Sequence, residues 1–247
     1  MQKDTLDLWS PQLRNRRNVD VYLPDSYGSG RRRYPVVYMQ DGQNLQDPAI
    51  AFAGNTWHLE DGLLWLAARG IEPIVVGVHN TGVDRMNEYS PFKDPNNGGG
   101  AGARYARFLI DTVKARIDAG YRTEPDRAGN VIAGSSMGGL ISLYAFFRRA
   151  SPFGGAAVIS PSVWFGGRKI LGIVQRSRRR GGRLYVDVGT GEGIGTLRDA
   201  RALDRMVRRK GHQVDALRYQ EFQGHEHREA DWAWRLPQAL EFLLRQG

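Results

Sequence analysis

The sequence predicts a single α/β domain over residues 1–247, with a mostly parallel central sheet and helices on both of its faces. Three observations lead to this fold class. Short apolar runs alternate with segments of helical periodicity, the succession that builds parallel β-α-β units. Runs such as 34–39 and 73–78 are apolar throughout, as strands buried on both faces are. A length of 247 residues and a hydrophobic content of 41% suffice for one sizeable core.

The N-terminal half is expected to begin at the edge of the sheet. Residues 18–23 alternate polar and apolar side chains, as a half-buried strand does, and residues 5–9 are expected to pair with them as a hairpin. The alternation then predicts strands at 34–39 and 73–78 and helices at 59–68 and 104–117. Residues 92–102 have no periodicity and indicate a mobile loop that flanks a site.

The C-terminal half continues the alternation around one sharp turn. An apolar strand at 131–133 leads through this turn into a helix at 140–149. The same patterns predict strands at 155–159, 184–188 and 214–219 and helices at 169–178, 197–210 and 230–245. Pro237 is expected to kink the last helix or to split it, because proline lacks the N–H that a helix needs.

The turn between the strand at 131–133 and its helix is the most informative stretch, Gly134-Ser135-Ser136-Met137-Gly138-Gly139. A side chain at Gly134 or Gly138 would crowd a tight strand–turn–helix elbow, which explains both glycines. Ser136 stands at the turn, where the helix N-terminus favours negative charge. The alternative is a glycine-rich turn with a capping serine. The context of strand and helix favours a serine nucleophile for acyl transfer.

A serine hydroxyl needs a base that takes its proton, and five histidines are available. In this type of site the order along the chain is serine, acid, histidine. His58 and His79 precede the serine and break that order. His212 lies in an exposed connection before a strand. His225 and His227 lie between the last strand and the last helix, where the base is expected.

The acid that orients the histidine should follow the strand at 184–188. Glu192 lies in a glycine-rich loop at the carboxyl end of that strand and is the favoured acid. Asp187 is the rival, but it lies inside the strand and also fits a buried structural carboxylate. Asp199 is expected in the first turn of a helix, where a carboxylate meets the positive end of the helix dipole.

Two backbone N–H groups are expected to hold the oxyanion of the transition state. One belongs to Met137, directly after the nucleophile. The second should come from the loop after the strand at 34–39. Gly42 lets the backbone turn there, which leaves the N–H of Gln43 as the donor.

The chain carries a net charge of +9, mostly from arginine, with basic clusters at 31–33, 176–183 and 205–210. Such patches raise the possibility of nucleic-acid binding. Two clusters lie in predicted connections beside Gly or Ser, and no aromatic residues interleave with them as stacking on bases requires. We therefore expect solvated surfaces and no nucleic-acid partner. The surplus charge can still attract anionic substrates.

Other classes of protein are excluded by what the sequence lacks. Without cysteine there is no disulfide, thiolate metal site or cysteine nucleophile. His225 and His227 could form a metal pair, but no third ligand stands at a suitable spacing, so neither a metal nor a cofactor is expected. No apolar stretch is long enough for a membrane span. Residues 1–5 lack a secretory pattern, which predicts a cytoplasmic location. The oligomeric state is not predicted.

Several segments together resemble the esterase-D and enterochelin-esterase-like branch of the α/β-hydrolases, over nearly the whole chain. They are the elbow at 134–139, Asp20-Val21-Tyr22-Leu23-Pro24, Tyr34-Pro35-Val36-Val37-Tyr38, Gln40-Asp41-Gly42-Gln43-Asn44, Arg85-Met86-Asn87-Glu88-Tyr89-Ser90-Pro91, Tyr121-Arg122-Thr123, Ile159-Ser160-Pro161-Ser162-Val163-Trp164 and His227-Arg228-Glu229-Ala230-Asp231-Trp232. The resemblance implies an α/β-hydrolase fold.

The resemblance also implies roles for individual residues. The nucleophile of the family falls on Ser136, its histidine on His227 and its acid loop on Glu192. Many α/β-hydrolases carry His-Gly at the oxyanion loop, where this chain has Asp41-Gly42. Mycolyltransferase relatives also have Asp-Gly, and some relatives that open siderophore lactones work without the acid.

Four residues near strand ends are expected to bind the substrate, namely Asp41, Trp57, Arg85 and Trp164. For each tryptophan the alternative is core packing. Arg85 either pairs with Asp84 or Glu88 or meets a substrate carboxylate. The remaining tryptophans are expected to pack on their elements, at positions 9, 65, 232 and 234.

The sequence thus predicts a serine ester hydrolase that works through an acyl-enzyme. Its expected substrate is a siderophore lactone, a feruloyl or acetyl carbohydrate ester, or a small acyl ester. One alternative is an acyltransferase of the mycolyltransferase type on the same machinery. The other is a binding protein with a vestigial site, which leaves the ordered set of serine, acid and histidine unexplained.

Overall fold

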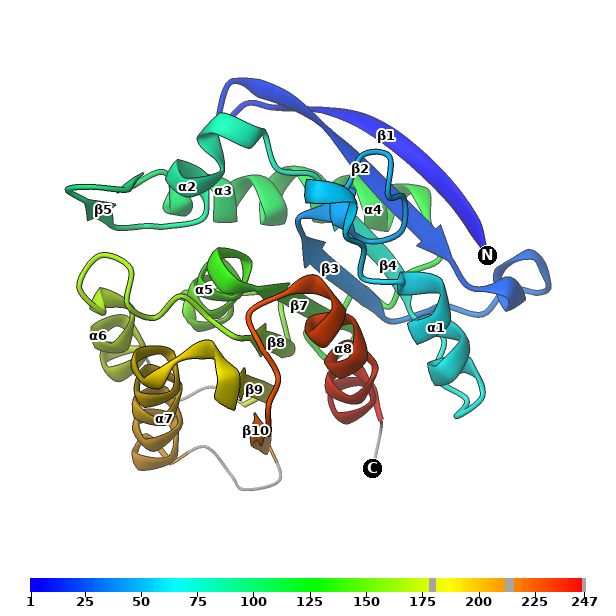
Figure 1. The fold of residues 1–247 in the computed structure, drawn as a ribbon. Helices are drawn as coiled ribbons and strands as arrows, with labels where there is room; N and C mark the ends of the chain where they lie inside the picture. Colours follow the sequence, from blue (N-terminus) through cyan, green and yellow to red (C-terminus); the bar gives the residue numbers. More distant parts are fainter. Residues whose placement is uncertain (178–180, 212–215, 246–247) are drawn as a thin grey trace.

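The computed structural model describes residues 1–177, 181–211 and 216–245. Within them an eight-stranded sheet runs in the order β1-β2-β4-β3-β7-β8-β9-β10 (Figure 1). The first two strands and β4 pair antiparallel, and all pairs from β4 to β10 are parallel. The strands are β1 (Gln2–Ser10), β2 (Asn15–Leu23), β3 (Val36–Gln40), β4 (Ile74–Val78), β7 (Asn130–Ser135), β8 (Gly155–Ile159), β9 (Arg183–Gly189) and β10 (Leu217–Phe222).

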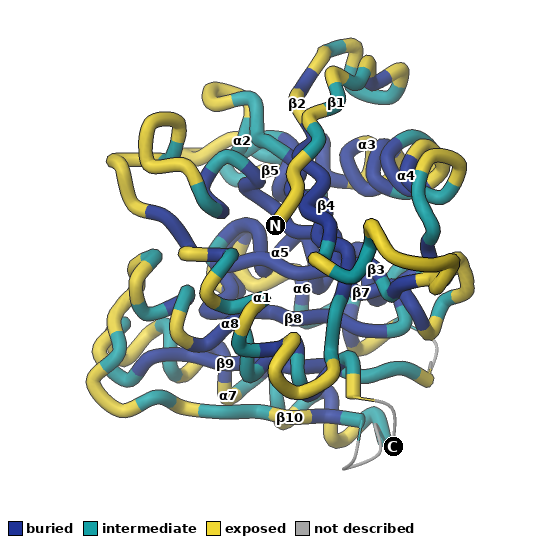
Figure 2. Tube along the Cα trace, turned by 90° about the vertical axis from the view of Figure 1, so that its right-hand side faces the viewer, coloured by how far each residue is buried: buried dark blue, intermediate teal, exposed yellow. Residues whose placement is uncertain are grey.

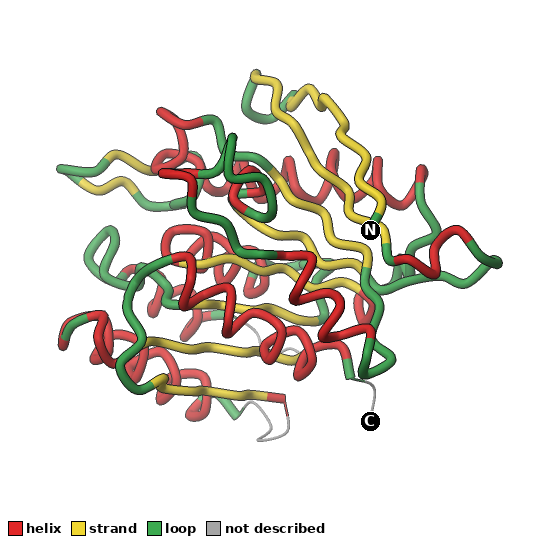
Figure 3. Tube along the Cα trace, turned by 45° about the vertical axis from the view of Figure 1, so that its right-hand side comes forward, coloured by secondary structure: helices red, strands yellow, loops and turns green. Residues whose placement is uncertain are grey.

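Helices cover both faces of this sheet (Figure 3). Helices α1 and α8 pack on one face, and the segment from α3 to α4 packs on the other with α5, α6 and α7. The helices are α1 (Leu59–Ala67), α2 (Arg85–Glu88), α3 (Gly102–Arg107), α4 (Ala115–Gly120), α5 (Ser136–Phe147), α6 (Lys169–Arg176), α7 (Ile194–Arg209) and α8 (Glu229–Leu244).

Two hydrophobic cores follow from the alternation of side chains along the buried strands. In β3, Val36 and Tyr38 belong to the core beneath α5, whereas Val37 and Met39 belong to the core beneath α1 and α8. This is the period of two expected for a strand between two helical layers. Figure 2 shows the central strands buried and the exposed residues gathered in peripheral segments. The predicted fold class is confirmed.

The structure corrects several expectations for single elements. Helix α8 runs unbroken through Pro237, which lies against Gly62 of α1. Residues 92–102 contain a two-stranded hairpin, β5 (Lys93–Asp94) with β6 (Gly98–Gly99). The helix expected at 104–117 extends from Gly102 to Gly120 with a π-helical centre. The last strand is displaced to Leu217–Phe222. Residues 178, 212, 214 and 215 of the predicted elements and connections lie outside the described residues.

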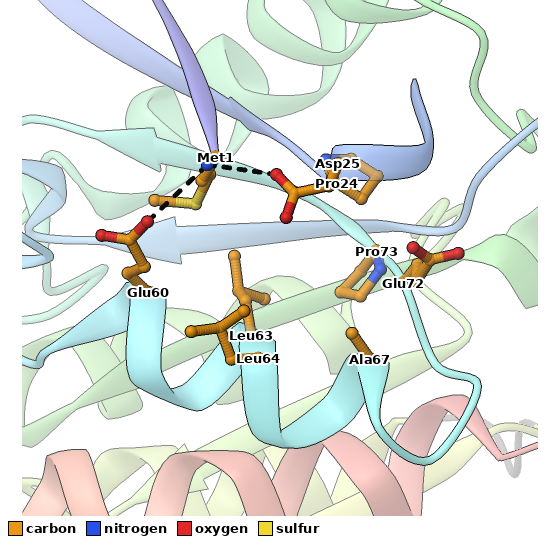
Figure 4. A pocket seen from close by; sticks show the side chains of 9 residues that line it. All are labelled: Met1, Pro24, Asp25, Glu60, Leu63, Leu64, Ala67, Glu72 and Pro73. Atoms are coloured by element: carbon orange, nitrogen blue, oxygen red, sulfur yellow. Dashed lines mark ion pairs between the residues drawn. The ribbon is translucent and has the colours of Figure 1, made fainter. Parts of the chain in front are cut away.

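A small pocket of about 50 Å³ lies between the start of β1 and helix α1 (Figure 4). The amino group of Met1 forms ion pairs there with Asp25, at 3.1 Å, and with Glu60, at 3.6 Å. Leu63 and Leu64 of α1 supply apolar lining. These contacts attach the edge strand to the helical layer.

No helix in residues 1–177, 181–211 or 216–245 is long and apolar enough to cross a bilayer. No group of three or more His, Asp or Glu side chains in these ranges is arranged to hold a metal ion. The cytoplasmic location stays a prediction.

Candidate active site

The predicted elbow lies between β7 and α5, with Ser136 at its tip. The backbone of Ser136 adopts φ 54°, a left-handed conformation that is strained for a non-glycine residue. A Cβ at Gly134 would stand 2.7 Å from the carbonyl carbon of Gly138, and one at Gly138 would stand 3.0 Å from Cβ of Gln40. The clash with backbone requires glycine at position 134, which confirms the steric argument there, and the contact at Gly138 is tight enough that Gln40 would have to shift. The turn projects Ser136 at the carboxyl edge of the sheet.

Residues from three separate loops meet at Ser136. His227 places Nε2 2.9 Å from the Ser136 Oγ, and its Nδ1 lies 2.7 Å from Oε2 of Glu192. His227 comes from the connection between β10 and α8, and Glu192 from the turn after β9. The His227 side chain is 41% exposed, whereas that of Glu192 is fully buried. The histidine is therefore accessible to solvent, whereas the acid lies in the protein interior.

The electrostatic environment keeps Glu192 ionised. Burial by itself would raise the pKa of Glu192, but hydrogen bonds from His227, Ser160 and the N–H of Gly189 outweigh it and hold that pKa below its usual range. An ionised carboxylate at Nδ1 favours the tautomer that leaves Nε2 free to accept a proton from a serine.

The two rival residues occupy other places. His225 packs its ring against Phe222 and Trp234, with centroids 5.4 and 5.3 Å away. Asp187 forms a buried ion pair with Arg235 at 3.0 Å. Burial raises the pKa of Asp187 to about 7, and the charge of Arg235 opposes this shift only in part. Of the alternatives that the sequence leaves open, the structure brings His227 and Glu192 to the serine.

The expected oxyanion loop follows β3 and is packed tightly against β4. Asp41 adopts φ 56°, and a Cβ at Gly42 would stand 2.3 Å from the carbonyl carbon of Gly77. Gln43 is the second residue of a short 3₁₀ turn, and Met137 is the second residue of α5. The N–H groups at such positions have no acceptor within their own helix and are available to a ligand.

Asp41 and Arg85 are paired with each other rather than free. Arg85 donates from Nε and Nη2 to the two carboxylate oxygens of Asp41, each at 2.8 Å, and Asn80 adds a third donor at 2.7 Å. The partners that the sequence suggested for Arg85 were therefore wrong. Glu88 instead forms a buried ion pair with Arg17. The arrangement ties the loop at Asp41 to the segment after β4.

A cavity of about 680 Å³ opens at Ser136 and His227. Asp41, Trp57 and Arg85 line it as expected, together with the apolar side chains of Ile50, Phe52 and Trp232. The lining residues are Asp41, Gln43, Asn44, Ile50, Phe52, Trp57, Asn80, Gly82, Arg85, Ser135, Ser136, His227, Glu229 and Trp232.

Two tryptophans lie differently with respect to this cavity than the sequence suggests, although Trp232 also packs in the core as expected. Trp164 does not line it; the side chain is 47% exposed and packs against Phe165. Trp232, expected only to pack on its helix, lines the cavity and meets the ring of His227 edge-on at 4.8 Å. Of the four residues expected from strand-end loops, Asp41, Trp57 and Arg85 line the cavity and Trp164 does not.

Sequence reasoning also missed polar residues behind and beside Ser136. The hydroxyl of Ser162 lies 3.2 Å from that of Ser136. Ser160 and Arg235 both contact Glu192. A usable signal existed for Arg235, because it interrupts the apolar stripe of the last helix three residues after Trp232. Buried charged residues are almost always paired, and this one has two carboxylate partners.

Comparison with known proteins agrees with this geometry. Residues 10–243 match the model of a protein family described as "Putative esterase". The chain belongs to this esterase family. It is therefore a carboxylic ester hydrolase with the α/β-hydrolase fold, and the resemblance drawn from the sequence is confirmed.

The individual proteins to which the chain is similar share less than a third of their residues with it. The protein "YbbA" of Bacillus subtilis (strain 168) is 26% identical over 204 residues, which cover 80% of this chain and 76% of that protein. An "Endo-1,4-beta-xylanase/feruloyl esterase" of Xylanibacter ruminicola is 29% identical over 150 residues, 59% of this chain but only 20% of that protein. The enterobactin esterase FES of Shigella flexneri shares the fold, with a TM-score of 0.75 and 17% identity over 99% of this chain and 59% of that chain.

Proposed function

We propose that Ser136, His227 and Glu192 form the catalytic triad of this ester hydrolase. The observation that carries the proposal is the unbroken series of hydrogen-bond distances, 2.9 Å from Ser136 Oγ to His227 Nε2 and 2.7 Å from His227 Nδ1 to Glu192 Oε2. Nucleophile, base and acid are thereby within the reach that proton transfer requires.

In the first half of the proposed reaction Ser136 Oγ attacks the ester carbonyl carbon while its proton moves to Nε2 of His227. The carboxylate of Glu192 stabilises the imidazolium that forms. The carbonyl oxygen becomes an oxyanion, which accepts hydrogen bonds from the N–H groups of Gln43 and Met137. One such donor is typically worth about 3 kcal/mol in the transition state.

Collapse of the tetrahedral intermediate breaks the bond to the alcohol, which leaves with the proton from His227. The acyl group then remains on Ser136 as an ester. In the second half a water molecule gives a proton to His227 and attacks the acyl carbon. The bond from that carbon to Ser136 Oγ then breaks, Oγ takes the proton back from His227, and the acid is released. No cofactor takes part in the proposed reaction.

For the substrate we propose a feruloyl or acetyl carbohydrate ester, a siderophore lactone or a small acyl ester. A cavity of about 680 Å³ with Phe52, Trp57 and Trp232 in its wall supports an ester that carries an apolar or aromatic part. Arg85 is the one arginine among the described residues that line the cavity, and its pairing with Asp41 offsets its charge, which supports an uncharged ester over a carboxylate.

The first experiment measures hydrolysis of p-nitrophenyl acetate, butyrate and octanoate by the wild type, Ser136→Ala and Ser142→Ala. Ser142 is a matched control because its buried hydroxyl has no hydrogen-bond partner in the described structure. We expect turnover to be lost only in Ser136→Ala, with thermal melting nearly unchanged. Retained hydrolysis in that variant would disprove the nucleophile. Product that shifts from free acid to a new ester when an alcohol is added would favour the acyltransferase alternative.

A further inference from the structure

Behind the proposed triad lies a serine to which no role has been given. Ser160 follows β8 and is fully buried, and its backbone adopts φ 44°. This left-handed conformation is unfavourable for any residue but glycine. Backbone strain of this kind persists where the surrounding structure holds it, and it concentrates at functional sites. The retention of a serine, rather than a glycine, points to a use for its hydroxyl.

The hydrogen bonds around Ser160 determine where its proton points. A serine hydroxyl has one proton and two lone pairs. Trp232 donates its indole N–H to the Ser160 Oγ at 3.1 Å, and Arg235 donates from Nη2 at 3.2 Å. Both lone pairs are thereby used. The proton of Ser160 is left for Oε1 of Glu192, which lies 2.5 Å away.

The two oxygens of the Glu192 carboxylate consequently have different partners. Its Oε1 accepts from Ser160 and from the N–H of Gly189 at 2.7 Å, with Arg235 Nη2 at 3.4 Å. Its Oε2 faces His227. Because Oε1 is held by several donors, the carboxylate cannot rotate without breaking them, and Oε2 stays directed at the histidine.

Helix α8 supplies the groups that orient this serine. Trp232 and Arg235 are three residues apart and therefore lie on the same face of the helix, toward the sheet. Arg235 is fully buried and is held in turn by Asp187, at 3.0 Å, and by the carbonyl of Asp231, at 3.2 Å. The groups behind the acid are thus buried and hydrogen-bonded to one another.

We propose that Ser160, oriented by Trp232 and Arg235, is a positioning residue that fixes the Glu192 carboxylate against His227. The proposal rests on the proposed triad, since Ser160 lies behind Glu192 and is absent from the residues that line the cavity. The proposal gives Ser160, in the segment 159–164, a role in the reaction and not only in the fold.

Two substitutions at one position separate this role from a structural one. Ser160→Ala and Ser160→Gly both remove the hydroxyl, but glycine relieves the strain at φ 44° whereas alanine does not. We expect both variants to lose about tenfold in kcat with KM nearly unchanged, although Ser160→Gly melts at a higher temperature than Ser160→Ala. Activity that follows the melting temperature instead would overturn the proposal.

A double-mutant cycle tests whether Ser160 acts through Glu192. In the background of Glu192→Gln, the change Ser160→Ala should lower kcat by no more than about twofold, because the carboxylate that it positions is gone. A full tenfold loss there would mean that the two residues act independently.

The full set of variants distinguishes failure of the positioning role of Ser160 from failure of the proposed triad. It contains the wild type, Ser136→Ala and the control Ser142→Ala, all measured with p-nitrophenyl acetate. Loss of activity in Ser136→Ala with full activity in both Ser160 variants refutes the positioning role alone. Retained activity in Ser136→Ala refutes the proposed triad, and the positioning role with it.

Discussion

The guanidinium of Arg85 holds the carboxylate of Asp41 through two parallel hydrogen bonds, each 2.8 Å long. The loop that begins at Asp41 carries Gln43, whose N–H is a proposed oxyanion donor. Asn80 adds to the connection, because its side chain donates to Asp41 and its own N–H donates to Oε1 of Gln43 at 3.2 Å. The loop is therefore attached to the neighbouring segment after β4 at two successive points.

Replacement of Arg85 by lysine should loosen this loop. Lysine keeps the charge but cannot present two parallel donors to one carboxylate. We expect Arg85→Lys to lower kcat for p-nitrophenyl acetate by about tenfold. The control is Arg201→Lys, because Arg201 makes the same fork with Glu221, at 2.7 and 2.7 Å, on an exposed surface. Equal kcat values for the two variants would argue against a role of the fork in the loop.

A methyl group at Gly42 should disturb the same loop by a steric route. Its Cβ would stand 2.3 Å from the carbonyl carbon of Gly77, and neither backbone can yield easily. We expect Gly42→Ala to lower the free energy of unfolding by about 1–3 kcal/mol and to reduce kcat. Urea denaturation measures the first effect. Gly195→Ala in α7 is the control, because no atom lies within 4 Å of its added Cβ, and it should leave stability unchanged or slightly higher.

Phe52 should contribute to substrate binding and little to folding. Its side chain is 72% exposed although it lines the cavity at Ser136. We expect Phe52→Ala to raise KM for p-nitrophenyl octanoate severalfold and to leave the melting temperature unchanged, because the lost contact is with the ester and not with the core. Ile194→Ala, at an 87% exposed position in α7, is the control. An equal KM for the octanoate in wild type and Phe52→Ala would remove Phe52 from the binding wall.

The raised pKa of Asp187 should make stability depend on pH in a defined window. Its pKa is about 7 in the folded protein against an ordinary value of 3.8, so the folded state holds a proton that the unfolded chain releases. Stability from this group therefore falls as pH rises from about 4 to 7, and then levels off. Asp187→Asn cannot titrate, so its melting temperature relative to wild type should increase between pH 5 and pH 8.5. A constant difference across these values would contradict the assignment.

Local patterns were sufficient for the strand–helix alternation and for the strand–turn–helix elbow that carries Ser136. The elbow around Ser136 was predictable because the need for Gly134 and Gly138 arises from contacts within a few residues and the adjoining strand. The strand–helix alternation is equally local. The split expected as one outcome at Pro237 does not occur: α8 continues through it, and Pro237 lies against Gly62 of α1, a contact that a single segment of sequence does not reveal.

The choice between His225 and His227, and between Asp187 and Glu192, depended on distant parts of the chain. His227 and Ser136 are 91 positions apart, and His227 and Glu192 are 35 apart. Asp187 lies inside β9 and Glu192 in the turn that follows it, and only the packed structure shows that Asp187 pairs with Arg235 whereas Glu192 meets His227. The position of Glu192 in the loop after β9 favoured it as the acid, and the family resemblance favoured His227; these are the two residues that the structure brings within hydrogen-bond distance of each other.

The sequence by itself determined the α/β alternation, the serine elbow and the short set of residues among which acid and base had to lie. It could do so because periodicity and steric demand are properties of neighbouring residues. Only the tertiary structure decided that Arg85 forms two hydrogen bonds to Asp41 and that Ser160 donates one to Glu192. Those contacts join residues 44 and 32 positions apart, and they exist because the parallel strands bring their carboxyl ends to one edge of the sheet.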